Sequence, residues 1–138
     1  MVGTSLRLAA ALILTSVLAA CSATPEAVRP PVPEQVPRAY QTGYASWYGK
    51  AHQGRRTTSG EAYDMNKLTA AHPTLPMGTR LLVTNLQNGR SVTVRVNDRG
   101  PTVDGRIVDL SYAAAREVGA VGAGVVRVRI EVVSMPSR

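Results

Sequence analysis

The run VNDRGP at positions 96–101 closes a stretch of alternating apolar and polar residues that begins at Ser91. Alternation of this kind predicts a β-strand with one buried face. Gly100 and Pro101 stop the strand, because glycine permits a close backbone approach and proline removes a backbone donor. The carboxylate of Asp98 is therefore expected where the strand becomes a turn, at the mouth of a folded domain.

Five more short strands are predicted around this one. They are short apolar or alternating runs bounded by glycine or proline, at 44–48, 68–71, 80–85, 107–110 and 125–133. Asn88-Gly89 predicts a hairpin with positive φ at both positions. Ser111 is expected to cap a helix over 112–118 that ends at Gly119. Six short strands and one or two short helices favour a small closed β-barrel over 43–133, with 134–138 as a tail.

The first 42 residues read as an export signal and a tether. Residues 1–20 carry Arg7 and then an apolar run too short to span a bilayer, which is typical of a signal peptide. The run ends in Leu-Ala-Ala before Cys21, the cleavage box of bacterial lipoproteins, so acylation of that thiol is expected. Residues 21–42 hold five prolines and few apolar residues, which predicts an extended chain. We expect an outer-membrane anchor with the domain facing the periplasm.

Composition excludes several chemistries. A single cysteine, needed for the lipid, leaves no thiol nucleophile and no zinc–cysteine site. The two histidines lack metal-ligand spacing, and phosphate-loop and nucleophile-elbow motifs are absent, so neither a metal nor a cofactor is expected. The net charge of +7 fits a solvated basic surface or attraction to an anionic polymer. Scattered basic residues and the export signal argue against nucleic acid. Carboxylate acid–base chemistry on an envelope polymer is what remains.

Each candidate acid also has a structural interpretation. Asp98 fits an Asx-type turn equally well from its local sequence. Glu61 and Asp64 fit exposed loop acids, and His72 fits a packed, hydrogen-bonded structural side chain. Asp109 is flanked by apolar residues, so it should be partly buried and needs a partner, which could be Arg99, Arg106 or backbone donors.

Several ordered motifs together resemble one family. They are ASWYG at 45–49, SGEAYDM at 59–65, LTAAHPTLPMGT at 68–79, VTNLQNGRSVTVRVNDRGP at 83–101 and GRIVDLS at 105–111. These motifs are similar to those of the RlpA (rare lipoprotein A) family over nearly the whole predicted domain. The resemblance implies an expansin-like double-psi β-barrel. It also implies an endolytic lytic transglycosylase, a lyase that cuts MurNAc-β-1,4-GlcNAc bonds in peptidoglycan and leaves 1,6-anhydroMurNAc ends.

The resemblance also implies roles for individual residues. The family's acids fall on Glu61 and Asp98 and its histidine on His72, with Asp98 as our choice for the general acid. Glu61 would raise the pKa of Asp98 or stabilise positive charge on the sugar, and His72 would orient an acid or bind sugar. The candidate sugar contacts are three aromatic and two polar side chains, namely Trp47, Tyr48, Tyr63, Asn97 and Arg99. The implied substrate is glycan without stem peptides, and a monomer is expected.

The sequence departs from the family pattern in three places. Thr102 stands where an aromatic residue often follows the DRGP motif, and 51–54 lacks the usual aromatic. No SPOR domain follows the predicted barrel, so septal targeting by that route is not expected. The rival interpretation is an expansin-like module that binds peptidoglycan without cleaving it. A structural lipoprotein that bridges membrane and wall is a third possibility.

Overall fold

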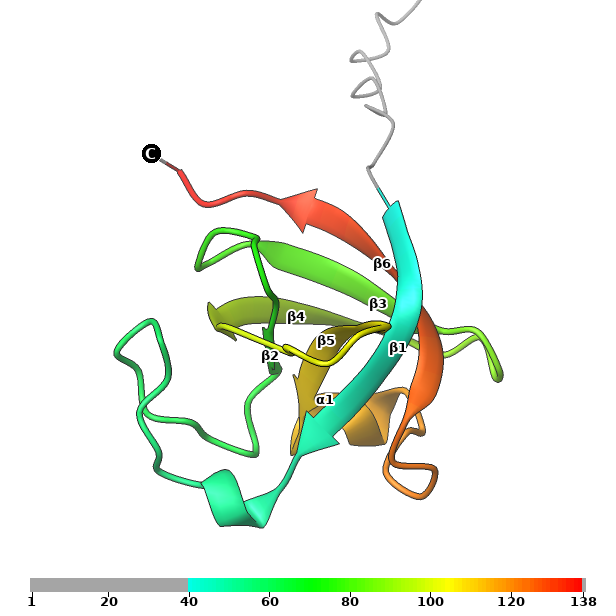
Figure 1. Ribbon diagram of the computed structural model, residues 1–138, viewed down its shortest axis with the longest axis horizontal. Helices are drawn as coiled ribbons and strands as arrows, with labels where there is room; N and C mark the ends of the chain where they lie inside the picture. The colour runs from blue at the N-terminus through cyan, green and yellow to red at the C-terminus, as the bar shows by residue number, and fades with distance from the viewer. Residues whose placement is uncertain (1–39, 138) are drawn as a thin grey trace, which may run out of the picture. The chain divides into compact units, whose positions relative to one another are not determined.

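The computed structural model describes residues 40–137, so the predicted signal peptide, Cys21 and most of the predicted tether lie outside the described residues. Within this range six strands close into a barrel in the order β1-β5-β2-β4-β3-β6 (Figure 1). The strands are β1 (Tyr40–Tyr48), β2 (Thr69–Ala71), β3 (Arg80–Asn85), β4 (Ser91–Asp98), β5 (Arg106–Ser111) and β6 (Val126–Ser134). This architecture confirms the predicted mainly-β barrel.

Two parallel pairings give the barrel its crossed topology. β1 runs parallel to β5, and β2 runs parallel to β4. The other four neighbouring pairs are antiparallel. Neither parallel pair is consecutive in the chain, so β1 reaches β5, and β2 reaches β4, only through other strands of the barrel. Of the predicted acids, Glu61 and Asp64 lie between β1 and β2, Asp98 is the last residue of β4, and Asp109 lies within β5.

The core is aliphatic, as the absence of phenylalanine requires. Buried and exposed residues alternate along β3, β4 and β6, which places one face of each strand inside the barrel. The largest buried apolar side chains are Leu81, Leu110, Val83, Val94, Val96, Val108, Val118, Val126 and Val128. The alternation along 91–96 and 125–133 therefore identified the inward faces of β4 and β6 correctly.

One helical turn and one helix accompany the barrel. The 3-10 turn η1 spans Lys50–His52, inside a segment predicted as loop. The helix α1 spans Tyr112–Glu117, and the Ser111 hydroxyl accepts a hydrogen bond from the Ala114 N–H at 3.2 Å, as predicted for an N-cap. Neither element has the length and hydropathy that crossing a membrane requires, and no other helix in residues 40–137 does.

Three details correct the predictions. β1 begins at Tyr40, because 40–42 pair with β6 through backbone hydrogen bonds that a polar composition does not reveal. β6 continues to Ser134, one residue beyond the predicted end. In the β3–β4 connection only Gly89 has positive φ, whereas Asn88 does not. The connection is longer than a two-residue turn, and Asn88 Oδ1 instead accepts from the Arg90 N–H at 2.9 Å.

Candidate functional site

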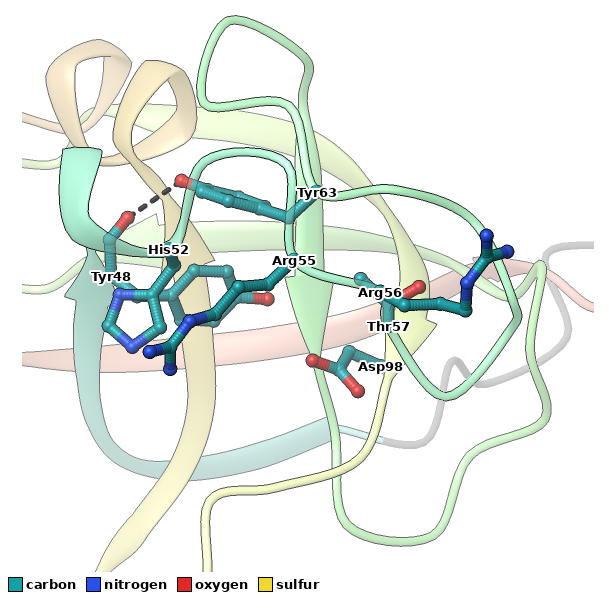
Figure 2. A pocket seen from close by; sticks show the side chains of 7 residues that line it. All are labelled: Tyr48, His52, Arg55, Arg56, Thr57, Tyr63 and Asp98. Carbon is teal, nitrogen blue, oxygen red and sulfur yellow. Dashed lines mark hydrogen bonds between the residues drawn. The ribbon is translucent and has the colours of Figure 1, made fainter.

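A pocket of about 140 Å³ opens at the end of β4. Figure 2 shows its walls converging from the end of β1, the connection after η1, and the tip of β4. The lining side chains are Tyr48, His52, Arg55, Arg56, Thr57, Tyr63 and Asp98. Asp98 is the only acid in this lining, so it is the carboxylate that a ligand in the pocket meets.

Hydrogen bonds from the protein hold one of the two carboxylate oxygens of Asp98. Its Oδ1 accepts from the Thr58 N–H at 3.0 Å, the Thr58 hydroxyl at 2.8 Å and the Arg99 N–H at 2.9 Å. Its Oδ2 accepts no hydrogen bond from residues 40–137. The Asx-type interpretation therefore holds for Oδ1, which organises the turn through these hydrogen bonds. The other oxygen is oriented and available to a ligand.

The segment that carries Thr58 is fastened to β4. Both the N–H and the hydroxyl of Thr57 donate to the Glu61 carbonyl at 2.8 Å, which closes a tight loop. The Ser59 N–H donates to the Asn97 carbonyl at 3.1 Å. These backbone contacts place Thr58 beside Asp98, although the two residues are 40 positions apart in the chain.

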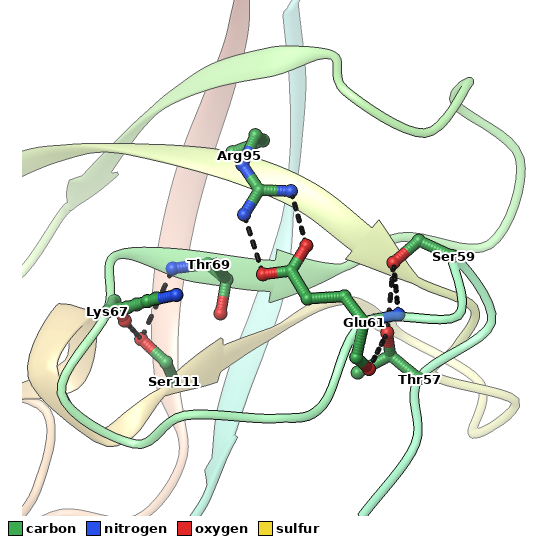
Figure 3. Close-up of polar contacts among 7 residues, drawn as sticks. All are labelled: Thr57, Ser59, Glu61, Lys67, Thr69, Arg95 and Ser111. Atoms are coloured by element: carbon green, nitrogen blue, oxygen red, sulfur yellow. Dashed lines mark hydrogen bonds and ion pairs between the residues drawn. The ribbon is translucent and has the colours of Figure 1, made fainter.

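Glu61 faces a different partner. Its two carboxylate oxygens receive the two terminal nitrogens of Arg95 at 2.7 and 2.9 Å, a bidentate ion pair (Figure 3). The Arg95 hydrogen bonds lower the pKa of Glu61, and a hydrogen bond from Asn97 acts in the same direction. Glu61 is therefore an ionised, paired carboxylate, and it is not among the residues that line the pocket.

His72 is buried and accepts hydrogen bonds at its Nδ1. The Thr74 and Leu75 N–H groups donate to that atom at 3.2 and 3.1 Å, which places the ring proton of the neutral form on Nε2. Burial lowers the pKa of His72, and the charge of Arg99 adds to the effect. The His72 N–H donates to the Asp98 carbonyl at 3.1 Å. His72 thus supports the backbone of Asp98 and does not line the pocket.

Two polar candidates for sugar contact are occupied or enclosed. Arg99 Nη1 donates to the carbonyls of His72 at 3.2 Å and Leu75 at 2.6 Å, so it braces the turn after β2. The Asn97 side chain is 1% exposed. The structure does not bring either residue into the pocket lining, because both belong to the support beneath Asp98.

The aromatic candidates divide into two groups. Trp47 packs against the core and against Tyr112, with ring centroids 5.6 Å apart, and it does not line the pocket. Tyr48 and Tyr63 do line it, in an edge-to-face contact at 4.7 Å. His52 lies 5.5 Å from the Tyr48 ring and was not predicted as a site residue.

A row of paired residues across neighbouring strands runs from Asp98 to Asp109. Asp109 on β5 pairs with Ala71 on β2, which pairs with Asp98 on β4, and Ser46 lies opposite Asp109 on β1. Asp109 accepts from Ser46 Oγ and Arg106 Nη2, each at 2.6 Å, so the predicted cation is Arg106 and not Arg99. Asp109 is satisfied as an ion pair.

Sequence reasoning missed Thr58, Arg95 and the basic residues of the pocket. Arg95 looked like an ordinary outward position of an alternating strand, and Thr58 like a loop residue. Their importance comes from partners distant in the chain, which no local pattern encodes. Within residues 40–137 no group of three acidic, histidine or cysteine side chains gathers as metal ligands would.

Comparisons with known proteins agree with this geometry. Residues 40–130 match the lytic transglycolase family. The chain is 58% identical over 95 residues to the endolytic peptidoglycan transglycosylase RlpA of Vibrio cholerae, covering 69% of this chain and 36% of the relative. The chain spans about a third of the length of the first curated relatives it matches.

Solved structures support the fold. The Streptomyces papain inhibitor superposes with a TM-score of 0.58 and 26% identity, covering 72% of this chain and 99% of the inhibitor. The apo expansin of Clavibacter michiganensis gives 0.58 and 25%, covering 72% of this chain and 53% of the expansin. Since one barrel serves an inhibitor and an expansin, function has to be argued from the pocket.

Proposed function

Because this chain belongs to the lytic transglycolase family, we propose that its barrel cleaves peptidoglycan glycan strands as an endolytic lytic transglycosylase. The bond cut is the MurNAc-β-1,4-GlcNAc linkage, and the product carries a 1,6-anhydroMurNAc end. The observation that carries the proposal is Asp98, which lines the pocket with one oxygen anchored by three donors and the other left for a ligand.

The chemistry needs one acid that also serves as a base. Protonated Asp98 gives its proton to the glycosidic oxygen as the bond from that oxygen to the anomeric carbon breaks. The 6-hydroxyl oxygen of the same MurNAc then bonds to the anomeric carbon, and its proton passes to the Asp98 carboxylate. The cycle consumes no water, and Asp98 regains its proton. Such acid–base assistance contributes about 10²–10⁴-fold in rate.

Glu61 and His72 have supporting roles in this proposal. The Arg95 pair keeps Glu61 charged, which suits it to hold the 57–61 loop and contribute negative potential, and not to donate a proton. His72 steadies the Asp98 backbone through its N–H and organises the following turn through its Nδ1. In this proposal both residues help to hold Asp98 in position and neither transfers a proton.

The basic side chains around the pocket favour glycan without stem peptides. Removal of the peptide leaves a free lactyl carboxylate on each MurNAc. Arg55 lines the pocket and its guanidinium has no hydrogen-bond partner among residues 40–137, whereas Arg56 donates to the Gly60 carbonyl at 2.5 Å. A guanidinium binds a carboxylate through two parallel hydrogen bonds. Arg55 is therefore placed to bind the lactyl carboxylate, which is free only in glycan without stem peptides.

Digestion of purified sacculi tests the proposal. The full chain is incubated with sacculi, with and without prior amidase treatment, and the soluble products are examined by mass spectrometry. We expect anhydro-muramyl fragments, more of them after amidase treatment, and none with Asp98→Asn. Absence of these fragments at high protein concentration, in both substrates, would contradict cleavage.

A second candidate is a non-catalytic, peptidoglycan-binding module of the expansin type. The observation that favours it is the superposition on an expansin at 25% identity. It predicts co-sedimentation with sacculi that Asp98→Asn does not abolish, and no new glycan ends. The same digestion therefore separates the two candidates, since only the enzyme creates anhydro ends.

We also propose that Cys21 is acylated and anchors the protein in the outer membrane, facing the periplasm. Support comes from the sequence alone, as Cys21 lies outside the described residues. Metabolic labelling with palmitate should mark the protein, and Cys21→Ser should lose both the label and the membrane fraction. Unchanged labelling in Cys21→Ser would contradict the anchor. A monomer is expected by light scattering.

A further inference from the structure

Two tyrosines line the pocket, and their hydroxyl groups are in opposite states. The Tyr63 hydroxyl donates to the Tyr48 carbonyl at 2.7 Å and accepts from the Tyr112 N–H at 3.2 Å. The Tyr48 hydroxyl is fully buried and has no hydrogen-bond partner within residues 40–137. The two rings pack edge to face, so the two phenols are neighbours that differ in whether the hydroxyl is hydrogen-bonded.

A buried, unpaired hydroxyl opposes folding. Proteins pair the great majority of such groups, and an exception calls for an explanation. A phenylalanine at position 48 would offer the same ring without the unpaired group. The hydroxyl is also enclosed, which argues against the sugar contact predicted for Tyr48 from the sequence. Its cost to folding points to a hydrogen bond that forms only during the reaction.

The available partner is Asp98. Figure 2 shows the Tyr48 ring running behind His52 and Arg55, with its hydroxyl end directed to the side of the pocket where Asp98 lies. Both side chains line the pocket, and Asp98 Oδ2 also lacks a hydrogen bond within the described residues. Burial is the first cause that raises the pKa of Tyr48, and the Asp98 charge is the second. The phenol therefore stays protonated and remains a donor.

We propose that Tyr48 is a positioning residue for the transglycosylase reaction, whose hydroxyl donates a hydrogen bond to Asp98 Oδ2 as that oxygen releases its proton to the glycosidic oxygen. The inference rests on the proposed function. It assigns Tyr48 a role through Asp98, in place of the sugar contact expected from the sequence.

The energetic reason is differential stabilisation. Before proton transfer Oδ2 carries the proton and has little need of a donor, and the hydroxyl is unpaired. As the proton leaves, negative charge develops on Oδ2 beside the buried phenol, and a donor held close to the developing charge stabilises it. An interaction made only in the transition state raises kcat without tightening substrate binding.

The test compares Tyr48→Phe with Tyr63→Phe in the full chain, using amidase-treated sacculi and thermal unfolding. Tyr48→Phe should lower kcat by about 10- to 100-fold, in the range of a lost preorganised donor, with KM little changed. Its melting temperature should stay the same or rise, because the deleted hydroxyl had no partner. Tyr63→Phe should lose about 5 °C, because its hydroxyl makes two hydrogen bonds, and its kcat should fall less.

Each result has one interpretation. A Tyr48→Phe protein with wild-type kcat, or with a melting temperature that falls as far as that of Tyr63→Phe, overturns the role of Tyr48 and leaves the proposed function standing. A rise in KM with unchanged kcat also overturns it, because that pattern is expected of a sugar contact. Failure of the unsubstituted chain to produce anhydro ends overturns the proposed function and this inference with it.

Discussion

Glu61 and Asp98 carry the same functional group, but they differ in how many of their carboxylate oxygens accept hydrogen bonds. Both oxygens of Glu61 are taken by Arg95 on the strand β4, whereas Asp98 at the tip of that strand has one oxygen anchored and one open to the pocket. A sequence motif marks both acids equally. The comparison teaches that the partner set, and not the residue type, separates a supporting carboxylate from a reactive one.

The largest expected effect comes from removing the reactive oxygen. Asp98→Asn should reduce the rate of anhydro-end formation by about 10²–10⁴-fold, since an amide can neither give nor take the proton. Its stability should change little, because the Asn side-chain oxygen can still accept from Thr58 and Arg99. Product analysis measures the rate of anhydro-end formation, and thermal unfolding measures the stability. An active Asp98→Asn would place the acid elsewhere.

Loosening the anchor of Asp98 should have the next largest effect. Thr58→Ala deletes the hydroxyl that donates to Oδ1 and leaves the backbone donor in place. We expect kcat to fall by about tenfold, the value of one hydrogen bond to a charged group in a half-exposed setting. Thr58→Ser is the matched control and should restore most of the activity. Equal losses in both variants would assign the effect to the loop and not to the hydroxyl.

Breaking the supporting pair should affect stability more than chemistry. Glu61→Gln should cost about 0.5–1 kcal/mol in the free energy of unfolding, because both partners are partly exposed to solvent. Arg95→Gln should cost about the same, and the double variant no more than either single one, as expected for a shared interaction. Chemical denaturation measures all three. Additive losses would show that the two side chains act independently.

The pH dependence of stability should separate His72 from Glu61. The folded-state pKa of His72 is lowered from its ordinary 6.5, so the unfolded chain takes up this proton first and stability falls as pH drops below about 6.5. The pKa of Glu61 is lowered from 4.5, so its contribution is complete above 4.5 and is lost in more acidic solution.

Thermal unfolding followed between pH 8 and pH 3 should therefore show two declines of a few degrees each. His72→Asn, which keeps an acceptor for the Thr74 and Leu75 N–H groups, should remove the upper decline. Glu61→Gln should remove the lower one. Persistence of the upper decline in His72→Asn would assign that proton to another group.

Much of the fold was predictable because its signals are local. The short apolar run within 80–85 and the alternation along 125–133 located two strands nearly to the residue, and Ser111 with Gly119 bounded the helix. The β1 start was missed because 40–42 join β6 through backbone pairing. The Asn88-Gly89 turn was misjudged because the Asn88 side chain makes its own contacts, including one to the Val118 carbonyl at 3.0 Å.

The candidate site was predictable in its residues and not in its arrangement. The motifs pointed to Asp98, Glu61 and His72, and the structure places all three around the tip of β4. They did not indicate that Thr58 anchors Asp98, that Arg95 occupies Glu61, or that His72 faces its own turn. Those contacts join segments 2 to 40 residues apart, and the longer ones depend on the parallel β2–β4 pairing.

The sequence by itself determined which faces of the strands are buried, where the helix is capped and which acids a strand and a loop present. These follow from periodicity and turn chemistry, which act over a few residues. Only the tertiary structure decided that Glu61 is paired and that, among the described residues, Asp98 keeps an open oxygen and the Tyr48 hydroxyl is buried without a partner. Each of these states depends on the distance between atoms from distant segments, and that distance exists only once the barrel has closed.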